Sequence, residues 1–314
     1  QVWDVSCERQ VELRGPDAGR LMQMLTPRDL RGMSPGQCYY VPIVDETGGM
    51  LNDPVAVKLA EDRWWISIAD SDLLYWVKGI ANGWRLDVLV DEPDVSPLAI
   101  QGPKAEMLME RVFGSRIRDI RFFRFGVFQF QGRDLVIARS GYSKQGGFEI
   151  YVEDSALGMP LWNKLFEAGM DLEVRAGCPN LVERIEGGLL SFGNDMTDDN
   201  TPHECGLGRF CDTHSAIGCI GRDALLRVAK EGPVQQIRPI AISGDPVPAC
   251  TDYWPLYASG KRVGRVSSAA WSPDFRMNVA IGMVRMTHWD AGSKLEVETP
   301  DGMRSATVRD KFWI

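Results

Sequence analysis

A change of pattern near Ile237 constrains the fold of this chain more than any other feature. Before it, amphipathic helical stretches mix with apolar strand-like stretches; after it, short strand-like segments follow one another, separated by Gly, Pro and Asp. Short strands punctuated by turn residues are typical of small β-barrels. We therefore predict an α+β chain with a larger region of two subdomains over residues 1–236 and a small C-terminal β-barrel over residues 237–314.

The length of the chain agrees with several cores. A chain of 314 residues exceeds what one hydrophobic core usually serves, so we expect two or three subdomains. The composition, 44% hydrophobic and 25% charged, is that of an ordinary soluble globular protein. We expect no membrane span, because no apolar run approaches the ~20 residues that one requires. We also expect no leader, because the start lacks a charged-then-apolar pattern.

The net charge of −8 restricts the partners. Nucleic acids and anionic membrane surfaces attract basic proteins, so we expect this acidic chain to bind neither. A small-molecule substrate is the remaining expectation, with the chain acting as a monomer or a homodimer.

The cysteines favour a reducing compartment. There are seven, an odd number, scattered and without a CxxC pair, which indicates reduced thiols and a cytoplasmic protein. Cys205, Cys211, His214 and Cys219 are close in sequence and raise the alternative of zinc, but their spacing fits no standard finger or ribbon. We therefore predict no metal site.

The stretch over residues 184–196 carries a carboxylate in an unusual setting. The pattern predicts an amphipathic helix over residues 181–191, with Glu186 on a largely apolar face and Gly187 and Gly188 directly after it. A carboxylate there is costly unless something donates hydrogen bonds to it, and glycines leave room for a flat ligand. Glu186 is thus a candidate for holding a planar ring with N–H donors, such as a pterin or a purine. The alternative is a surface glutamate at the edge of the core.

A hairpin brings a second carboxylate into consideration. Residues 38–44 and 50–59 are strand-like, and residues 45–49 form the turn. With the turn centred on residues 46 and 47, Tyr40 lies roughly opposite Asp53, give or take one residue for a bulge. Asp is disfavoured in strands. The pair is therefore a candidate for handling a proton or a cation, against the alternative of a polar residue on a solvated strand face.

The Gly-rich stretch over residues 139–149 is a third candidate. Its Tyr, Ser and Lys side chains are suited to a polar ligand, but it lacks the spacing of a phosphate loop. The alternative is an ordinary connection between strands.

The chain has no GxGxxG opening a helix after a strand, and with three histidines a Ser-His-Asp triad is hard to assemble. Further helices are predicted over residues 17–25, 72–80, 102–113 and 161–168, and further strands over residues 64–68, 125–131, 135–139 and 148–152.

Taken in order, these pieces resemble the folate-dependent aminomethyltransferase family, whose type member is the T-protein of the glycine cleavage system. The resemblance covers nearly the whole chain. It is carried by the segments at residues 4–6, 13–18, 48–53, 101–105, 139–149, 184–195, 201–207, 220–225, 263–268 and 272–273.

The resemblance implies a fold of three subdomains around a central channel that holds tetrahydrofolate as co-substrate. By matching position, Glu186 would bind the pterin amino group and ring N–H. Asp53 and Tyr40 would lie beside the reacting N5 of the folate, and Tyr142 would lie on the folate-side loop.

Three departures from the T-protein pattern resemble the branch of the family that demethylates dimethylsulfoniopropionate. They are Asn52, Ala69 and the pair Lys144-Gln145. The hypothesis is methyl transfer from a sulfonium to N5 of tetrahydrofolate, with an aromatic wall of Tyr40 and Trp271 around the cation. Two alternatives are an aminomethyl or betaine-type methyl transferase with an ammonium donor, and a non-catalytic folate-binding protein.

Overall fold

The chain divides into two compact units. A computed structural model describes residues 1–68, 72–212 and 214–314. Unit 1 comprises residues 1–43, 52–179 and 217–219, and unit 2 comprises residues 44–51, 180–216 and 220–314. Both units contain helices and strands, so the predicted α+β class is confirmed. The predicted boundary between residues 236 and 237 stays a prediction.

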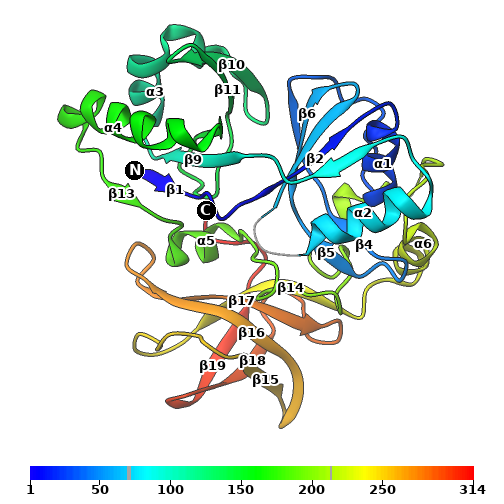
Figure 1. The fold of residues 1–314 in the computed structure, drawn as a ribbon. Coiled ribbons are helices and arrows are strands. Elements are labelled where there is room, and N and C mark those ends of the chain that lie inside the picture. Colours follow the sequence, from blue (N-terminus) through cyan, green and yellow to red (C-terminus); the bar gives the residue numbers. More distant parts are fainter. Residues whose placement is uncertain (69–71, 213) are drawn as a thin grey trace. The chain divides into compact units, whose positions relative to one another are not determined.

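A five-stranded antiparallel sheet forms one part of unit 1 (Figure 1). Its strand order is β3 (Gln37–Tyr40), β6 (Val55–Ala60), β7 (Arg63–Ser67), β2 (Gln10–Arg14) and β8 (Leu89–Asp91). Helices α1 (Ala18–Leu25) and α2 (Leu73–Gly83) contact β7 and β8 of this sheet, respectively. Residues such as Leu21, Met22 and Leu25 are buried on one side of α1, as the 3.6-residue period predicts.

A six-stranded sheet forms the other part of unit 1. Its order is β10 (Phe125–Phe130), β11 (Arg133–Ala138), β12 (Gly147–Glu153), β9 (Val95–Gln101), β1 (Val2–Asp4) and β13 (Ala176–Gly177). Only the β1–β13 pair among these is parallel. Helices α3 (Ala105–Phe113) and α4 (Gly158–Ala168) pack against it, and the buried side chains between them form one hydrophobic core.

The two sheets of unit 1 share a smaller apolar cluster. Cys38, Val57 and Trp65 come from the five-stranded sheet, and Val136 and Tyr151 come from the six-stranded sheet. The rings of Trp65 and Tyr151 lie 5.5 Å apart. Because residues paired across a strand ladder share a face, the Cys38–Val57 and Val57–Trp65 pairs place this cluster on the same face of the sheet as Tyr40.

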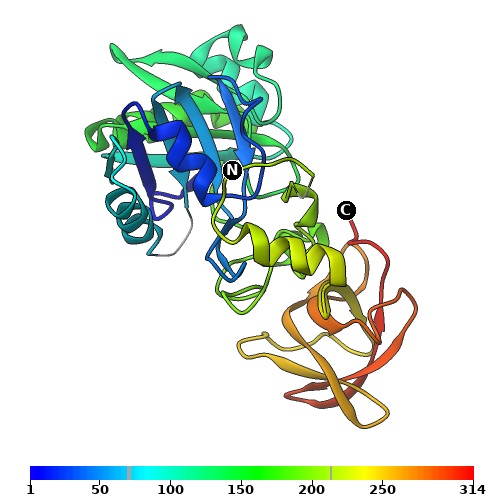
Figure 2. The same ribbon diagram turned by 90° about the vertical axis from the view of Figure 1, so that its right-hand side faces the viewer.

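The predicted C-terminal barrel is present in unit 2. Figures 1 and 2 show its strands, coloured yellow to red, curling into a closed cylinder. The order is β14 (Gln235–Ile242), β17 (Met277–Arg285), β16 (Lys261–Ser272), β15 (Trp254–Ala258), β18 (Lys294–Thr299) and β19 (Gly302–Val308), and β19 closes on β14. In β18, exposed and buried residues alternate along Lys-Leu-Glu-Val-Glu-Thr, because successive side chains of a strand point to opposite faces.

Prolines interrupt the predicted hairpin. Its outer part is the β3–β6 pair, and its tip is a separate pair, β4 (Ile43–Val44) and β5 (Met50–Asn52). Pro42 and Pro54 lie in the breaks, where a residue without an N–H group does least damage to the ladder. Residues 44–51 of this tip belong to unit 2, which also contains α5 (Leu181–Gly187) and α6 (Arg222–Glu231).

We predict that Gly264→Ala destabilises the barrel. A Cβ at Gly264 would meet the backbone carbonyl oxygen of Met283, well inside van der Waals contact. Backbone cannot move aside cheaply, so we expect a loss of about 1–3 kcal/mol in the free energy of unfolding, measured by urea denaturation.

Gly79→Ala is the matched control. Gly79 lies in α2, and a Cβ added there would have no atom of the described residues within 4 Å. Alanine in an open helix position is expected to gain up to about 1 kcal/mol. Equal effects of the two substitutions would contradict the packing at Gly264.

Candidate functional site

The structure brings Tyr40 and Asp53 into direct contact. The Tyr40 hydroxyl donates to Oδ2 of Asp53 over 2.6 Å. The ladder register differs from the prediction by two residues, since Tyr40 pairs with Val55. A two-residue shift leaves every side chain on its original face, and a diagonal neighbour is still within reach of a long side chain. The predicted contact is therefore present although the predicted register is wrong.

Arg28 fixes the backbone beside this pair. Its Nη1 donates to the carbonyl oxygen of Tyr40 over 2.6 Å, and its guanidinium lies 4.2 Å from the ring centroid of Tyr39. A planar, permanently charged group can stack and donate at the same time. Arg28 was missed in the sequence because its segment, after α1, has no periodic or motif signal that connects it to the hairpin.

A buried glutamine organises the loop that carries Tyr142. Oε1 of Gln101 accepts from the Ser143 hydroxyl over 2.6 Å, and its Nε2 donates to the carbonyl oxygen of Ser140 over 3.1 Å. Gln101 is only 3% exposed. A Cβ on Gly141 or Gly147 would collide with its amide group, so glycine at both positions makes room for Gln101. The loop is therefore built around Gln101 and holds the half-buried Tyr142 on its surface.

Acidic groups are gathered behind this loop. The Ser140 hydroxyl donates to the Glu149 carboxylate, and burial raises the pKa of Glu149. Burial together with the Glu149 charge also raises the pKa of the Cys38 thiol and of the Tyr151 hydroxyl. A buried thiol of raised pKa is protonated and unreactive at neutral pH, so Cys38 is a core residue.

The helix that carries Glu186 is shorter than predicted. It ends at Gly187 instead of Ser191, because Gly188 adopts a left-handed conformation with φ of 64°, which glycine accepts without steric cost. A Cβ on Gly188 would overlap the ring of Phe312. The space beside this glycine thus accommodates a side chain of the same unit, which corrects the expectation that Gly188 opens it to a flat ligand.

Glu186 itself lies in a buried position. The residue is only 6% exposed. Within the part of the chain that the structure describes, no hydrogen-bond donor is recorded for its carboxylate, although its carbonyl oxygen accepts from the Trp313 N–H over 2.7 Å. The carboxylate oxygens still reach solvent, so water can hydrate them in place of protein donors. Donors supplied by a ligand would satisfy them.

The predicted residues are distributed over both units. Tyr40, Asp53 and Tyr142 belong to unit 1, and Glu186 and Trp271 belong to unit 2. Trp271 is half-buried on β16, where it pairs with Asn278 of β17. Their roles stay predictions.

The positions that distinguish the demethylase branch have different surroundings. Asn52 is 1% exposed, and among the described residues its Nδ2 has no hydrogen-bond partner. Lys144 is exposed in a left-handed turn with φ of 60°. Ala69 lies outside the described residues.

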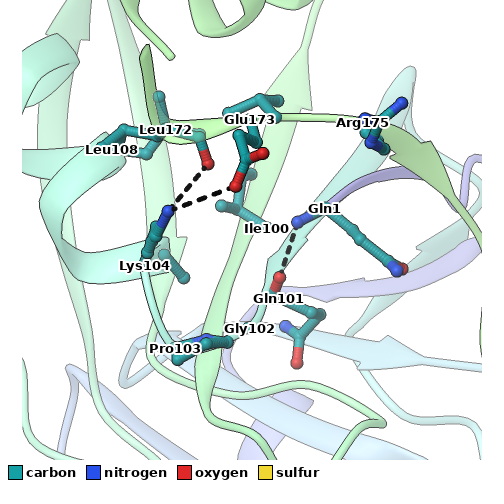
Figure 3. Close-up of a pocket in the computed structure, with 12 residues that line it drawn as sticks. Gln1, Ile100, Gln101, Gly102, Pro103, Lys104, Leu108, Leu172, Glu173 and Arg175 are labelled. Atoms are coloured by element: carbon teal, nitrogen blue, oxygen red, sulfur yellow. Dashed lines mark hydrogen bonds and ion pairs between the residues drawn. The ribbon is translucent and has the colours of Figure 1, made fainter. Parts of the chain in front are cut away.

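A surface pocket of unit 1 is separate from these residues (Figure 3). It has a volume of about 270 Å³, and none of the predicted site residues is among those that line it. Lys104 lies on its wall, with Nζ 3.8 Å from the Glu173 carboxylate and 3.4 Å from the Leu172 carbonyl oxygen. In the described residues, no group of three or more His, Cys, Asp or Glu side chains is arranged to hold a metal ion.

Comparison with known proteins defines the class. Residues 1–215 match the family model of the GCVT N-terminal domain, and residues 236–313 match that of the glycine cleavage T-protein C-terminal barrel domain. The chain belongs to the glycine cleavage T-protein family.

Two related proteins and one solved structure show how similar this chain is to individual members of the family. The chain is 63% identical over 313 residues to dimethylsulfoniopropionate demethylase DmdA of Ruegeria pomeroyi, covering 100% of this chain and 85% of that protein. It is 30% identical to an aminomethyltransferase of Symbiobacterium thermophilum, covering 94% and 81%. The crystal structure of aminomethyltransferase T from Bartonella henselae superimposes with a TM-score of 0.88 at 25% identity, covering 100% and 86%. The predicted aminomethyltransferase-like fold is confirmed.

The helices do not include a membrane span. Across residues 1–68, 72–212 and 214–314, none is both long enough and apolar enough to cross a bilayer.

We predict that Glu8 makes stability depend on pH. Burial and the neighbouring Glu149 carboxylate raise its pKa from 4.5 to about 8. The unfolded chain therefore ionises at lower pH than the folded chain, so stability present below about pH 4.5 is lost as the pH rises through about 8. Glu8→Gln is expected to reduce the fall in unfolding free energy over this range, measured by urea denaturation. An unchanged fall would contradict the assignment, and Glu46→Gln, at an exposed turn residue, is the control.

Proposed function

We propose that this chain is a tetrahydrofolate-dependent demethylase that moves a methyl group from dimethylsulfoniopropionate to N5 of tetrahydrofolate. The observation that carries the proposal is 63% identity along the full chain to a protein named for this demethylation. Two aminomethyltransferases in the same comparison reach 30% and 24% identity. The family has one fold, and the difference in identity favours the sulfonium donor over an ammonium donor.

The reaction makes modest demands on acid–base chemistry. One C–S bond breaks and one N5–C bond forms, giving 3-methylmercaptopropionate and 5-methyltetrahydrofolate, and the N5 proton is released. The thioether leaves as a neutral group, so it needs no general acid. The protein contributes mainly alignment of the reacting atoms and exclusion of water.

Glu186 is suited to the pterin. The residue is largely buried, its carboxylate has no recorded donor among the described residues, and the carboxylate oxygens still reach solvent. A pterin presents an amino group and a ring N–H side by side. Two charge-assisted hydrogen bonds to one carboxylate fix the ring plane as well as its position. A carboxylate that reaches solvent from a largely buried residue, without a protein donor among the described residues, is the structural observation with which tetrahydrofolate fits.

Asp53 and Tyr40 are suited to the reacting nitrogen. The Tyr40 hydroxyl donates to Oδ2 of the Asp53 carboxylate over 2.6 Å, so the two side chains lie together on one hairpin. We assign to Asp53 the stabilisation of positive charge that develops on N5 and the acceptance of its proton, directly or through water.

Aromatic side chains are assigned to the sulfonium and the folate. The faces of Tyr40 and Trp271 offer cation–π contacts to a sulfonium, and both residues are half-buried. Tyr142 is assigned to folate contact from the loop that Gln101 supports.

The cellular setting is also part of the proposal. Cys7, Cys38, Cys178 and Cys250 are free thiols, which suits a cytoplasmic protein. The net charge of −8 suits a small-molecule enzyme that binds neither nucleic acid nor membrane and acts as a monomer or a homodimer.

We predict both products from the purified protein. Incubation with dimethylsulfoniopropionate and tetrahydrofolate is expected to yield 3-methylmercaptopropionate and 5-methyltetrahydrofolate in equal amounts, identified by mass spectrometry. Glycine betaine serves as the ammonium donor in a parallel reaction. Turnover of betaine but not of dimethylsulfoniopropionate would show that the methyl donor is an ammonium compound. Binding of tetrahydrofolate without turnover of either donor would indicate a non-catalytic folate-binding protein.

We predict that two carboxylates have separable effects. Glu186→Gln removes a charged acceptor and should weaken tetrahydrofolate binding by roughly 10- to 100-fold, as expected for a hydrogen bond to a charged group, measured by calorimetry. Asp53→Asn should lower kcat by about 100-fold or more with a smaller effect on binding. Asp62→Asn, at an exposed turn residue, is the control, and identical profiles for Glu186→Gln and Asp53→Asn would contradict the assignment.

A further inference from the structure

The Asp195 carboxylate in unit 2 receives four hydrogen bonds. Its Oδ2 accepts from Nη1 of Arg184 over 2.8 Å and from the Ser191 N–H over 2.9 Å. Its Oδ1 accepts from the hydroxyls of Ser267 and Ser268 over 2.6 and 2.7 Å. Asp195 is fully buried. We call Arg184, Asp195, Ser267 and Ser268 the Asp195 network.

The network joins the Glu186 helix to the barrel. Arg184 lies on α5, and its Nη2 donates to the Ser268 hydroxyl on β16 over 2.6 Å. The same hydroxyl accepts from Nδ2 of Asn194 over 2.8 Å. Because the polar atoms of the network satisfy one another, α5 has a defined attachment to one point of β16.

A β-bulge makes this attachment possible. Val266 pairs with Gly282 and Ser268 pairs with Ile281, so Ser267 is an extra residue in β16. In a regular strand two consecutive side chains point to opposite faces, and both serines could not reach one carboxylate. The extra residue redirects the strand locally and places both hydroxyls on the same oxygen.

The last turn of α5 is also held by residues near 312. The N–H groups of Trp313 and Ile314 donate to the Glu186 carbonyl oxygen over 2.7 and 3.2 Å. The ring of Phe312 occupies the space that the missing side chain of Gly188 leaves. The turn that carries Glu186 is thus held both through Arg184 and through the Glu186 carbonyl oxygen, while the Glu186 carboxylate has no recorded donor among the described residues.

We propose that the Asp195 network positions Glu186 for the pterin, so that tetrahydrofolate affinity depends on a bulge in a barrel strand. Ser267 and Ser268 are positioning residues that act through Arg184 and α5. This inference rests on the proposed function of Glu186. It adds that the barrel, through its bulge, sets the orientation of the folate anchor.

The test is a double-mutant cycle on tetrahydrofolate binding. The variants are Ser268→Ala, Glu186→Gln and their combination, with dissociation constants measured by calorimetry on the full chain. We expect Ser268→Ala to weaken binding by at least about threefold, the lower end of couplings within one network. In the Glu186→Gln background the same substitution should have little further effect. Independent, multiplying effects would overturn the inference.

Further variants separate positioning from general destabilisation. Ser268→Thr keeps the hydroxyl and should restore affinity, whereas alanine should not. Thr299→Val removes another buried barrel hydroxyl, one that donates to the Gly302 carbonyl oxygen over 2.8 Å, and should leave affinity unchanged. If Thr299→Val weakens binding as much as Ser268→Ala, the effect is one of stability and the inference fails.

A substitute variant and two further measurements complete the test. If Ser268→Ala does not fold, Ser267→Ala, which removes a single donor from Asp195, takes its place in the cycle. Weaker binding in Ser268→Ala with unchanged binding in Glu186→Gln would overturn the inference. Demethylation of dimethylsulfoniopropionate by the unmodified chain is measured separately. If the unmodified chain demethylates but the cycle shows no coupling, the inference fails and the proposed function stands. In steady-state kinetics, we expect KM for tetrahydrofolate to rise more than kcat falls.

Discussion

Burying the charges of Arg184 and Asp195 imposes the local order of unit 2. Ions removed from water lose their solvation, and their attraction compensates only when the remaining lone pairs and protons are also satisfied. The Asp195 carboxylate meets this requirement with four donors. Three separate segments supply them, and the bulge in β16 follows from the need to bring two consecutive hydroxyls to one oxygen.

In unit 1 a buried polar side chain also holds a segment in place, but this side chain is neutral. Gln101 uses both ends of its amide to hold the loop of Tyr142, and a neutral amide is less costly to bury than an ion. In both units, a fully satisfied buried group fixes the segment that carries a predicted site residue. That residue is Tyr142 in unit 1 and Glu186 in unit 2. Rigid placement of this kind is what a methyl transfer with a neutral leaving group requires.

Parts of the site were predictable because their determinants are local. Tyr40 and Asp53 lie on one hairpin, and the period-2 alternation of strands tolerates an error of two residues in the register. Their hydrogen bond was therefore anticipated even though the prolines divide the hairpin and shift the ladder. Arg28, Gln101 and Ser268 were not identified in these roles. Arg184 and Ser268 are separated by 84 residues, and Gln101 and Ser143 by 42, and no local pattern encodes such pairs.

The sequence by itself determined the elements whose signals are periodic: the amphipathic helices of unit 1, and the alternating strands of the barrel, of which β18 is the clearest. It did not predict α6 of unit 2. It also determined membership of the T-protein family, because the family motifs occur in order along the sequence and can be identified without knowledge of which residues are in contact. The tertiary structure alone decided where the Glu186 helix ends. Helical periodicity continues to Ser191, but Gly188 turns left-handed and Phe312 fills the space beside it. A helix end set by a ring from a distant part of the sequence depends on packing, which only the folded chain contains.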